Sequence, residues 1–213
     1  MGSIPAGPAS YIGVPVPIHN FFHSFVSSDI ININNEDLKQ YAYQEQQTSP
    51  GRQMTNRGGW QSNILNRDDT ILQPLIENIL IKANELHSTL GFKDTLYQAL
   101  DNMWININPP GGRNEYHRHP RSFFSGTYYV ATDKLTGPIL FRNPIQVHNW
   151  VITPDMIGIK NEFNGRGCEF NPSVGTLLFF PSWLEHRVNE NNSDINRISI
   201  SFNTQIVPKG MTL

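Results

Sequence analysis

Three histidines and one arginine carry the strongest chemical signal in the sequence. His117 and His119 are two residues apart. On a β-strand this spacing places both imidazoles on one face, because side chains alternate along the strand. His186 follows an apolar run, and Arg197 opens an alternating segment after ten further residues. Two neighbouring nitrogen ligands, a third from a distant strand and a cation beyond it would form an open metal site beside an anion site.

This ligand pattern is typical of non-haem iron sites, which use a face of three protein ligands and leave positions open for cosubstrate and oxygen. The commonest set is two histidines and one carboxylate. Here the sequence offers His117, His119 and His186, and histidine is a neutral ligand near pH 7. Taken alone, a His-x-His pair also fits a polar strand face exposed to water. The three histidines together with Arg197 favour the metal site.

Arg197 supplies the expected anion site. A guanidinium binds a carboxylate through two parallel hydrogen bonds and stays charged in a dry pocket. Ser199 is two residues further along the same strand, so it shares the face of Arg197 and can donate its hydroxyl to the same carboxylate. The alternative for Arg197 is a surface salt bridge.

The segment from His186 to Ser199 resembles the second half of the signature of Fe(II)/2-oxoglutarate-dependent dioxygenases. In that family the first half usually reads His-x-Asp or His-x-Glu, whereas this chain has His117-Arg-His119. The wider resemblance spans roughly residues 14–206. It is to a small group of oxygenases of this class from marine bacteria and their tailed phages. The segments that carry it are 58–62, 104–108, 124–130 and 197–203.

The third metal ligand is the point of departure from the family pattern, and three alternatives compete. His119 is the ligand, or it lies beside the site while water or an anion replaces the carboxylate, or a carboxylate from elsewhere enters, with Glu115 and Asp133 the nearest in sequence. We favour His119. A neutral third ligand leaves the site one charge more positive than a carboxylate would.

The resemblance also implies how cofactors would bind. The 1-carboxylate and 2-oxo group of 2-oxoglutarate would chelate Fe(II), and its far carboxylate would reach Arg197, helped by Ser199 and Tyr128. Asn106 and Asn108 would contact this cosubstrate from the strand before the metal pair, although a solvent-facing role fits them equally well. With O2, the reaction would hydroxylate an unidentified prime substrate. The rim of its pocket is predicted at Trp60, Arg118, Arg121 and residues 142–172.

The remaining histidines rank lower as ligands. His87 is predicted to lie on the surface near the end of a helix, while His19 and His23 carry no partner signal. His148 could line the substrate entrance, but a surface loop position is favoured for it. Two interpretations fit Trp60 equally well: it lines the rim of the pocket, or it anchors its loop to the core.

The surrounding elements predict an α+β fold. Helices are expected over residues 36–46 and 68–90, and the hydrophobic period changes to two from residue 96 onward. We predict one domain over 1–213, with an extended arm (1–17), a helical support region (18–95) and a jelly-roll core (96–207). The core would be a double-stranded β-helix, cupin-like, with the N-terminal helices packed on one sheet.

Composition narrows the other possibilities. The net charge of −2 and the absence of a long apolar stretch predict neither a broad nucleic-acid surface nor a membrane span. The single cysteine, Cys168, excludes an internal disulfide and fits a reducing compartment. Residues 1–11 do not resemble a signal peptide. A cytoplasmic location, in a bacterium or an infected host cell, follows as an expectation, and the sequence leaves a homo-oligomer open.

Two other functions compete with the oxygenase. Three histidines with an open position also describe a zinc hydrolase or lyase, although that chemistry needs no arginine at a fixed offset. A jelly roll can equally be a non-enzymatic phage structural component, with the histidines incidental or holding a structural metal.

Overall fold

The protein is described by a computed structural model over residues 23–145, 153–159 and 164–211. The predicted arm at 1–17 and the histidines at 19 and 148 lie outside these ranges. Neither of the two α-helices in the described part has the length and apolar character of a membrane span.

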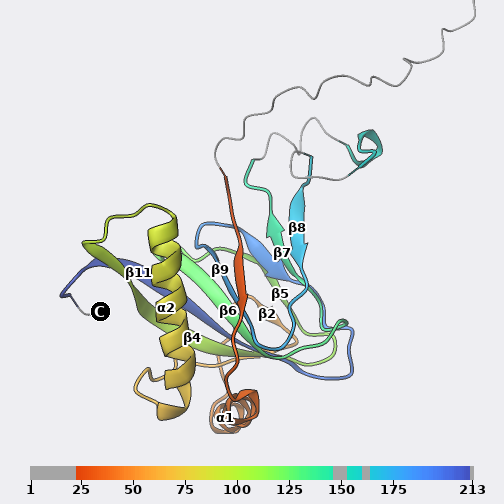
Figure 1. The fold of residues 1–213 in the computed structure, drawn as a ribbon. Coiled ribbons are helices and arrows are strands. Elements are labelled where there is room, and N and C mark those ends of the chain that lie inside the picture. The colour runs from red at the N-terminus through yellow and green to blue at the C-terminus, as the bar shows by residue number, and fades with distance from the viewer. Residues whose placement is uncertain (1–22, 146–152, 160–163, 212–213) are drawn as a thin grey trace, which may run out of the picture.

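Two antiparallel sheets face each other and form the core of the fold (Figure 1). The six-stranded sheet has the order β1 (Ser27–Ile30), β9 (Thr176–Pro181), β6 (Phe124–Ala131), β11 (Arg197–Pro208), β4 (Leu96–Asn108), β3 (Trp60–Gln61). The five-stranded sheet has the order β2 (Asn56–Arg57), β5 (Arg113–His117), β10 (His186–Val188), β7 (Ile139–Arg142), β8 (Gly167–Phe170). The predicted double-stranded β-helix is confirmed.

The two helices form where the sequence predicted them. In α1 (Asn35–Thr48), the side chain of Asn34 accepts hydrogen bonds from the backbone N–H groups of Glu36 and Asp37, which satisfies free donors of the first turn. A short 3-10 turn, η1 (Thr70–Leu72), leads into α2 (Gln73–Thr89). Gly91 follows α2 with a φ of 75°, a left-handed conformation that glycine adopts without strain. A second 3-10 turn, η2, covers Pro154–Met156.

Both helices cover the outer face of the six-stranded sheet, α2 on β4 and α1 on β6 (Figure 1). The apolar stripe of α2 is buried in this layer, which includes Leu75, Ile79 and Ala83. A second, smaller apolar cluster that includes Tyr129, Ile139 and Phe180 lies between the two sheets. The six-stranded sheet is therefore buried on both faces, and the space between the sheets beyond this second cluster is where polar side chains gather.

The predicted helical support region, residues 18–95, contains both helices and also supplies β1, which pairs with β9, as well as β2 and β3. One expectation for this region was wrong. His87 was expected on the surface, but it is buried, with one ring nitrogen 3.0 Å from the Lys93 carbonyl oxygen and the other 3.3 Å from the Gln98 amide. Such a histidine satisfies both nitrogens within the core and has a structural role.

Candidate metal centre

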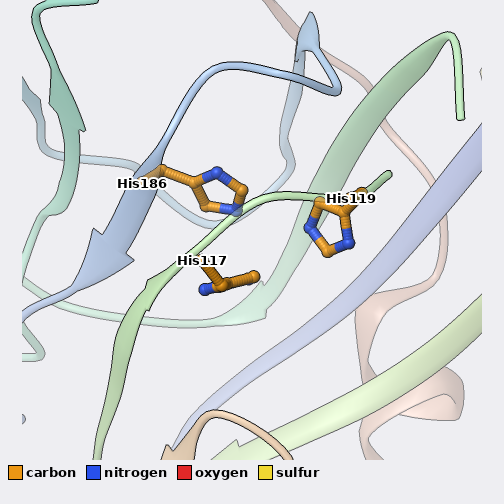
Figure 2. A group of neighbouring side chains, drawn as sticks. All are labelled: His117, His119 and His186. Carbon is orange, nitrogen blue, oxygen red and sulfur yellow. The ribbon is translucent and has the colours of Figure 1, made fainter. Parts of the chain in front are cut away.

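The three histidines that the sequence singled out meet in one place. β5 ends at His117, β10 begins at His186, and the two residues are direct partners across the antiparallel pair. Their ring centroids are 4.3 Å apart, and the ring of His119 lies 5.0 Å from His117 and 5.2 Å from His186. One ligand atom from each residue lies within 4.8 Å of the others. Figure 2 shows the three rings gathered around a common space.

Backbone carbonyls fix the orientation of two of these rings. Nδ1 of His117 lies 2.8 Å from the carbonyl oxygen of Glu115, and Nδ1 of His186 lies 2.9 Å from that of Leu184. A carbonyl oxygen can only accept, so in both residues Nδ1 carries the proton. Nε2 then keeps its lone pair for a metal, the arrangement that a hydrogen bond to the distal nitrogen of a ligating histidine produces.

Burial keeps all three imidazoles in their neutral form. Desolvation lowers the pKa of His117 below its ordinary value. It lowers the pKa of His119 to about 4, with repulsion from His117 as a second cause, and it lowers the pKa of His186 well below the ordinary range. At pH 7 the site therefore presents three uncharged nitrogen donors, the form that a divalent cation requires.

Within the described part of the chain, no carboxylate joins this group of histidines. The carboxylate of Glu115 pairs with Arg113, at 3.1 Å. Asp133 accepts hydrogen bonds from the hydroxyl of Ser193 and the backbone N–H of Leu135. Both predicted substitutes for a third ligand are thus engaged elsewhere, and imidazole nitrogen is a donor that suits Fe, Zn, Cu and Ni.

Arg197 lies in the same interior and is only 1% exposed. Its Nη1 donates to the backbone carbonyls of Thr136, Gly137 and Asn189, so the guanidinium is held by the backbone. Its Nη2 is buried and has no hydrogen-bond partner in the described structure. Burial lowers the pKa of Arg197 to about 10, so the group remains charged at pH 7. A buried cation with an unused donor is costly unless an anion binds to it.

A cavity of about 240 Å³ between the sheets joins the histidines to Arg197. It is lined by Arg52, Met54, Thr55, Gln61, Ile64, Trp104, Asn106, Asn108, Asn114, His117, Arg118, His119, Gly126, Thr127, Tyr129, Ile139, Phe180, His186, Val188, Arg197, Ser199 and Ser201. Three neutral nitrogen donors and a buried cation therefore face one small cavity, as a chelated metal and a bound carboxylate would require.

The predicted polar residues of β4 and β11 also line this cavity. Ser199 pairs with Asn106 in the strand register, and Arg197 pairs with Asn108. Asn106 donates from Nδ2 to the hydroxyl of Ser201 at 3.1 Å, while its Oδ1 is buried without a partner. The amide of Asn108 is already bonded to Asn114 at 3.2 Å. Asn106 and Ser199 are thus the better placed of these residues to contact a ligand.

Tyr128 was predicted beside Arg197, but the structure places it on the opposite face of β6. Its hydroxyl donates to the side chain of Asn35 on α1, and its ring belongs to the core beneath the helices. Tyr129 lines the cavity instead. Burial raises the pKa of Tyr129 to about 12, and the neighbouring positive charge of Arg197 partly opposes this rise. Strand alternation explains the error, because Thr127 and Tyr129 share one face and Tyr128 the other.

The predicted rim is only partly formed by the residues named for it. Arg118 lines the cavity, but Trp60 and Arg121 do not. Trp60 donates from its indole to the backbone carbonyl of Ser49 at 3.1 Å and packs against the core, which favours the pinning role. Arg52, from the same loop, was not predicted and lines the cavity. Of the segment 142–172, none of the described residues lines it.

Comparison with known proteins agrees with this geometry. Residues 102–203 match the model of the family described as "Putative 2OG-Fe(II) oxygenase". No curated protein sequence matches the chain.

Solved structures show the same fold. A prolyl-4-hydroxylase from Pseudomonas putida has 14% identity and a TM-score of 0.57 over 84% of this chain and 91% of its own. The viral collagen prolyl hydroxylase of Paramecium Bursaria Chlorella virus-1, bound to 2OG, has 11% identity and a TM-score of 0.53, with coverages of 84% and 94%. The epimerase SnoN, in complex with Fe3+ and alpha ketoglutarate, has 10% identity and a TM-score of 0.58, with coverages of 87% and 82%. At these identities the likeness concerns the double-stranded β-helix.

Proposed function

We propose that the chain is a 2-oxoglutarate-dependent Fe(II) oxygenase that couples the oxidative decarboxylation of 2-oxoglutarate to the hydroxylation of a prime substrate. The observation that carries the proposal is the shared cavity, in which three neutral imidazoles face the unpartnered Nη2 of Arg197. Fe(II) bound there would supply the activation of O2 that the protein's own side chains cannot provide.

The donor set fits a divalent iron. His117 and His186 would bind through Nε2, because their Nδ1 atoms are committed to backbone carbonyls. We propose His119 as the third ligand, since no described carboxylate lies within reach of the other two histidines. Three protein ligands would leave three positions of an octahedral ion for cosubstrate and oxygen.

Arg197 fits the far carboxylate of 2-oxoglutarate. Its Nη1 is held by three carbonyls and no carboxylate of the described residues pairs with its charge, so Nη2 could donate a charge-assisted hydrogen bond to a ligand. Ser199 lies on the same face, and Tyr129 lies close enough to Arg197 for the charge to affect its pKa. We therefore propose that Tyr129, and not Tyr128, assists in binding this carboxylate.

The test uses ligand binding and turnover together. Under anaerobic conditions, 2-oxoglutarate should raise the melting temperature of the protein only when Mn(II), as an inert substitute, is present. With Fe(II) and O2, succinate should form. His117→Ala, His119→Ala and His186→Ala should each abolish the metal-dependent shift, while His23→Ala, which changes an exposed histidine outside the cavity, should preserve it.

Two results would contradict specific parts of the proposal. A shift with 2-oxoglutarate that does not depend on metal would exclude chelation at the histidines. Retention of tight metal binding in His119→Ala alone would exclude His119 as a ligand and favour a carboxylate or water in its place. Neither the zinc hydrolase nor the structural jelly roll gives the unpartnered Nη2 of Arg197 a role, so the geometry favours neither.

Three finer points remain proposals that the resemblance supports. They are kinship with the oxygenases of marine bacteria and tailed phages, a cytoplasmic location and a single domain over residues 1–213. Size-exclusion chromatography would measure whether the chain forms a homo-oligomer.

A further inference from the structure

Two arginines stand where the cavity meets solvent. Arg52 and Arg118 both line it and both are exposed, whereas Arg197 is buried at its inner end. If Arg197 binds the cosubstrate, as the proposed function holds, these two cations have no role in binding 2-oxoglutarate. The ligand assigned to these two cations below therefore rests on that proposed function.

The local charge balance leaves both arginines available. Asp and Glu are absent from the described residues that line the cavity. The nearest carboxylate to Arg118 is Glu185, at 3.6 Å, and Glu185 also pairs with Arg142. One carboxylate shared by two guanidinium groups leaves a net positive charge. Arg52 forms no ion pair with any residue of the described structure.

The proposed ligands make the cavity more positive. Imidazole binds a metal in its neutral form, so a divalent ion and Arg197 together would outweigh the two negative charges of 2-oxoglutarate by one. A carboxylate in place of His119 would have cancelled this excess. The field at the entrance is therefore positive even when the cosubstrate is bound, and it attracts an anion from solution.

The fold holds the backbone at both arginines in place. The backbone N–H of Arg52 donates to the carbonyl of Gln61 at 2.8 Å, and the adjacent Gly51 lies against the indole of Trp60. A side chain at Gly51 would meet that indole at 2.4 Å, so glycine is required for this packing. The backbone of Arg118 lies between the two proposed ligands His117 and His119, and the N–H of His119 donates to the carbonyl of Ser182 at 3.0 Å. Positions this constrained suit recognition of a substrate group at a set distance from the reacting atom.

We infer that the prime substrate carries an anionic group, a carboxylate, phosphate or sulfate, which Arg52 and Arg118 bind at the cavity entrance. The remainder of the substrate would extend past the half-exposed Met54 and Ile64 and inward along the buried Trp104. The anionic group thus sets the register, and the carbon that reaches the metal is determined by its distance from that group.

The experiment measures anion binding directly, without a known substrate. Sodium sulfate and, separately, sodium acetate are titrated at constant ionic strength into protein loaded with Mn(II) and 2-oxoglutarate under anaerobic conditions, and binding is followed by calorimetry. Sulfate tests a tetrahedral oxyanion and acetate a planar carboxylate. Saturable binding of at least one anion is expected. Arg52→Gln and Arg118→Gln should each weaken it by about tenfold or more, since each removes a hydrogen bond from a charged donor.

Arg121→Gln is the matched control, because Arg121 is an exposed arginine three residues from Arg118 that does not line the cavity. It should leave anion binding unchanged. The inference would be overturned if neither anion shows saturable binding. It would also be overturned if the wild-type, Arg52→Gln and Arg118→Gln proteins bind the anion equally well. Failure of the proposed function would look different, because 2-oxoglutarate would then give no metal-dependent thermal shift.

A second measurement uses turnover. Small organic acids and their uncharged amides are compared in matched pairs for the succinate that they elicit with Fe(II), 2-oxoglutarate and O2. Acids should stimulate succinate formation and their amides should not. An amide that stimulates as well as its acid would contradict the inference even if sulfate binds.

Discussion

Replacing Arg197 by lysine is the most informative single change, because it keeps the charge and removes the geometry. In the wild-type protein Nη1 is used by the carbonyls of Thr136, Gly137 and Asn189, and Nη2 is left for a ligand. A lysine ammonium is a single point that cannot occupy both positions. It would stay with the carbonyls or move toward the ligand, so the hydrogen bond to 2-oxoglutarate would weaken or the carbonyls would lose their donor.

The expected size of the effect follows from the bond that is lost. A hydrogen bond to a charged group contributes about 1.5–3 kcal/mol, which corresponds to an affinity loss of at least about tenfold. At a 2-oxoglutarate concentration of about 100 times Kd, binding stabilises the wild-type protein by about 2.7 kcal/mol, and a tenfold weaker Kd reduces this to about 1.4 kcal/mol. For a domain of this size, each kcal/mol of stabilisation raises the melting temperature by about 2–4 °C. The ligand-induced shift should therefore be about 5–11 °C in the wild-type protein and about half of that in Arg197→Lys.

Differential scanning fluorimetry with Mn(II), with and without 2-oxoglutarate, measures this shift directly. Arg187→Lys is the matched control. Arg187 also has a buried guanidinium nitrogen without a partner, but it lies over the ring of Tyr116, outside the cavity lining. Its variant should keep the full shift. An undiminished shift in Arg197→Lys would mean that Nη2 does not contact the cosubstrate, and the anion site would have to be sought elsewhere.

Three further predictions concern other parts of the site. Tyr129→Phe should raise the Kd of 2-oxoglutarate by about twofold to tenfold, because one neutral hydrogen bond is lost. Tyr128→Phe should lower stability and leave that Kd unchanged, and the opposite result in calorimetry on the two proteins would show that Tyr128 is the residue that binds. Alanine in the left-handed region costs about 1–2 kcal/mol, and Gly51→Ala should destabilise the protein by more than this because its methyl group would meet the indole of Trp60. Gly91→Ala, with a similar φ and open space around it, should show the backbone cost alone when both variants are unfolded in urea. The metal-free protein should be most stable above about pH 6.5 and lose stability as the pH falls toward about 4, because the unfolded chain takes up a proton at His119 before the folded chain does. An equally steep pH dependence of the melting temperature in His119→Gln would show that this residue is not the cause.

The meeting of the three histidines was largely predictable from residue spacing. A His-x-His pair on a strand places both rings on one face, and this can be predicted from the sequence. The pairing of His117 with His186 cannot, because it arises only when the jelly roll brings β10 alongside β5. Arg197 and Ser199 follow the same rule on β11. Alternation is a local property, so it can be read from one strand alone.

The errors have a common physical cause. Choosing Tyr128 over Tyr129 required knowledge of which face of β6 turns toward the helices, and both faces of this strand are buried, so hydrophobicity does not distinguish them. The alternation from Thr127 could have corrected the choice once the cavity side was known. His87 was misplaced for a similar reason, because its burial depends on Gln98 of a later strand. Arg52 was missed because no local sequence pattern marks a loop residue whose backbone N–H is bonded to the carbonyl of Gln61.

The backbone has replaced carboxylates throughout the described site. The carbonyls of Glu115 and Leu184 orient two histidines, and three further carbonyls hold Arg197. Carbonyl oxygens satisfy donors without adding negative charge, so the positive charge of a metal and of Arg197 would remain for ligands to neutralise. A dianionic cosubstrate would neutralise most of it, and the excess of one charge that the proposed ligand His119 would leave is the physical reason to expect an anionic group on the prime substrate. Exchanging His119 for aspartate would remove that excess, so anion binding at the entrance should weaken in His119→Asp even though Arg52 and Arg118 are unchanged.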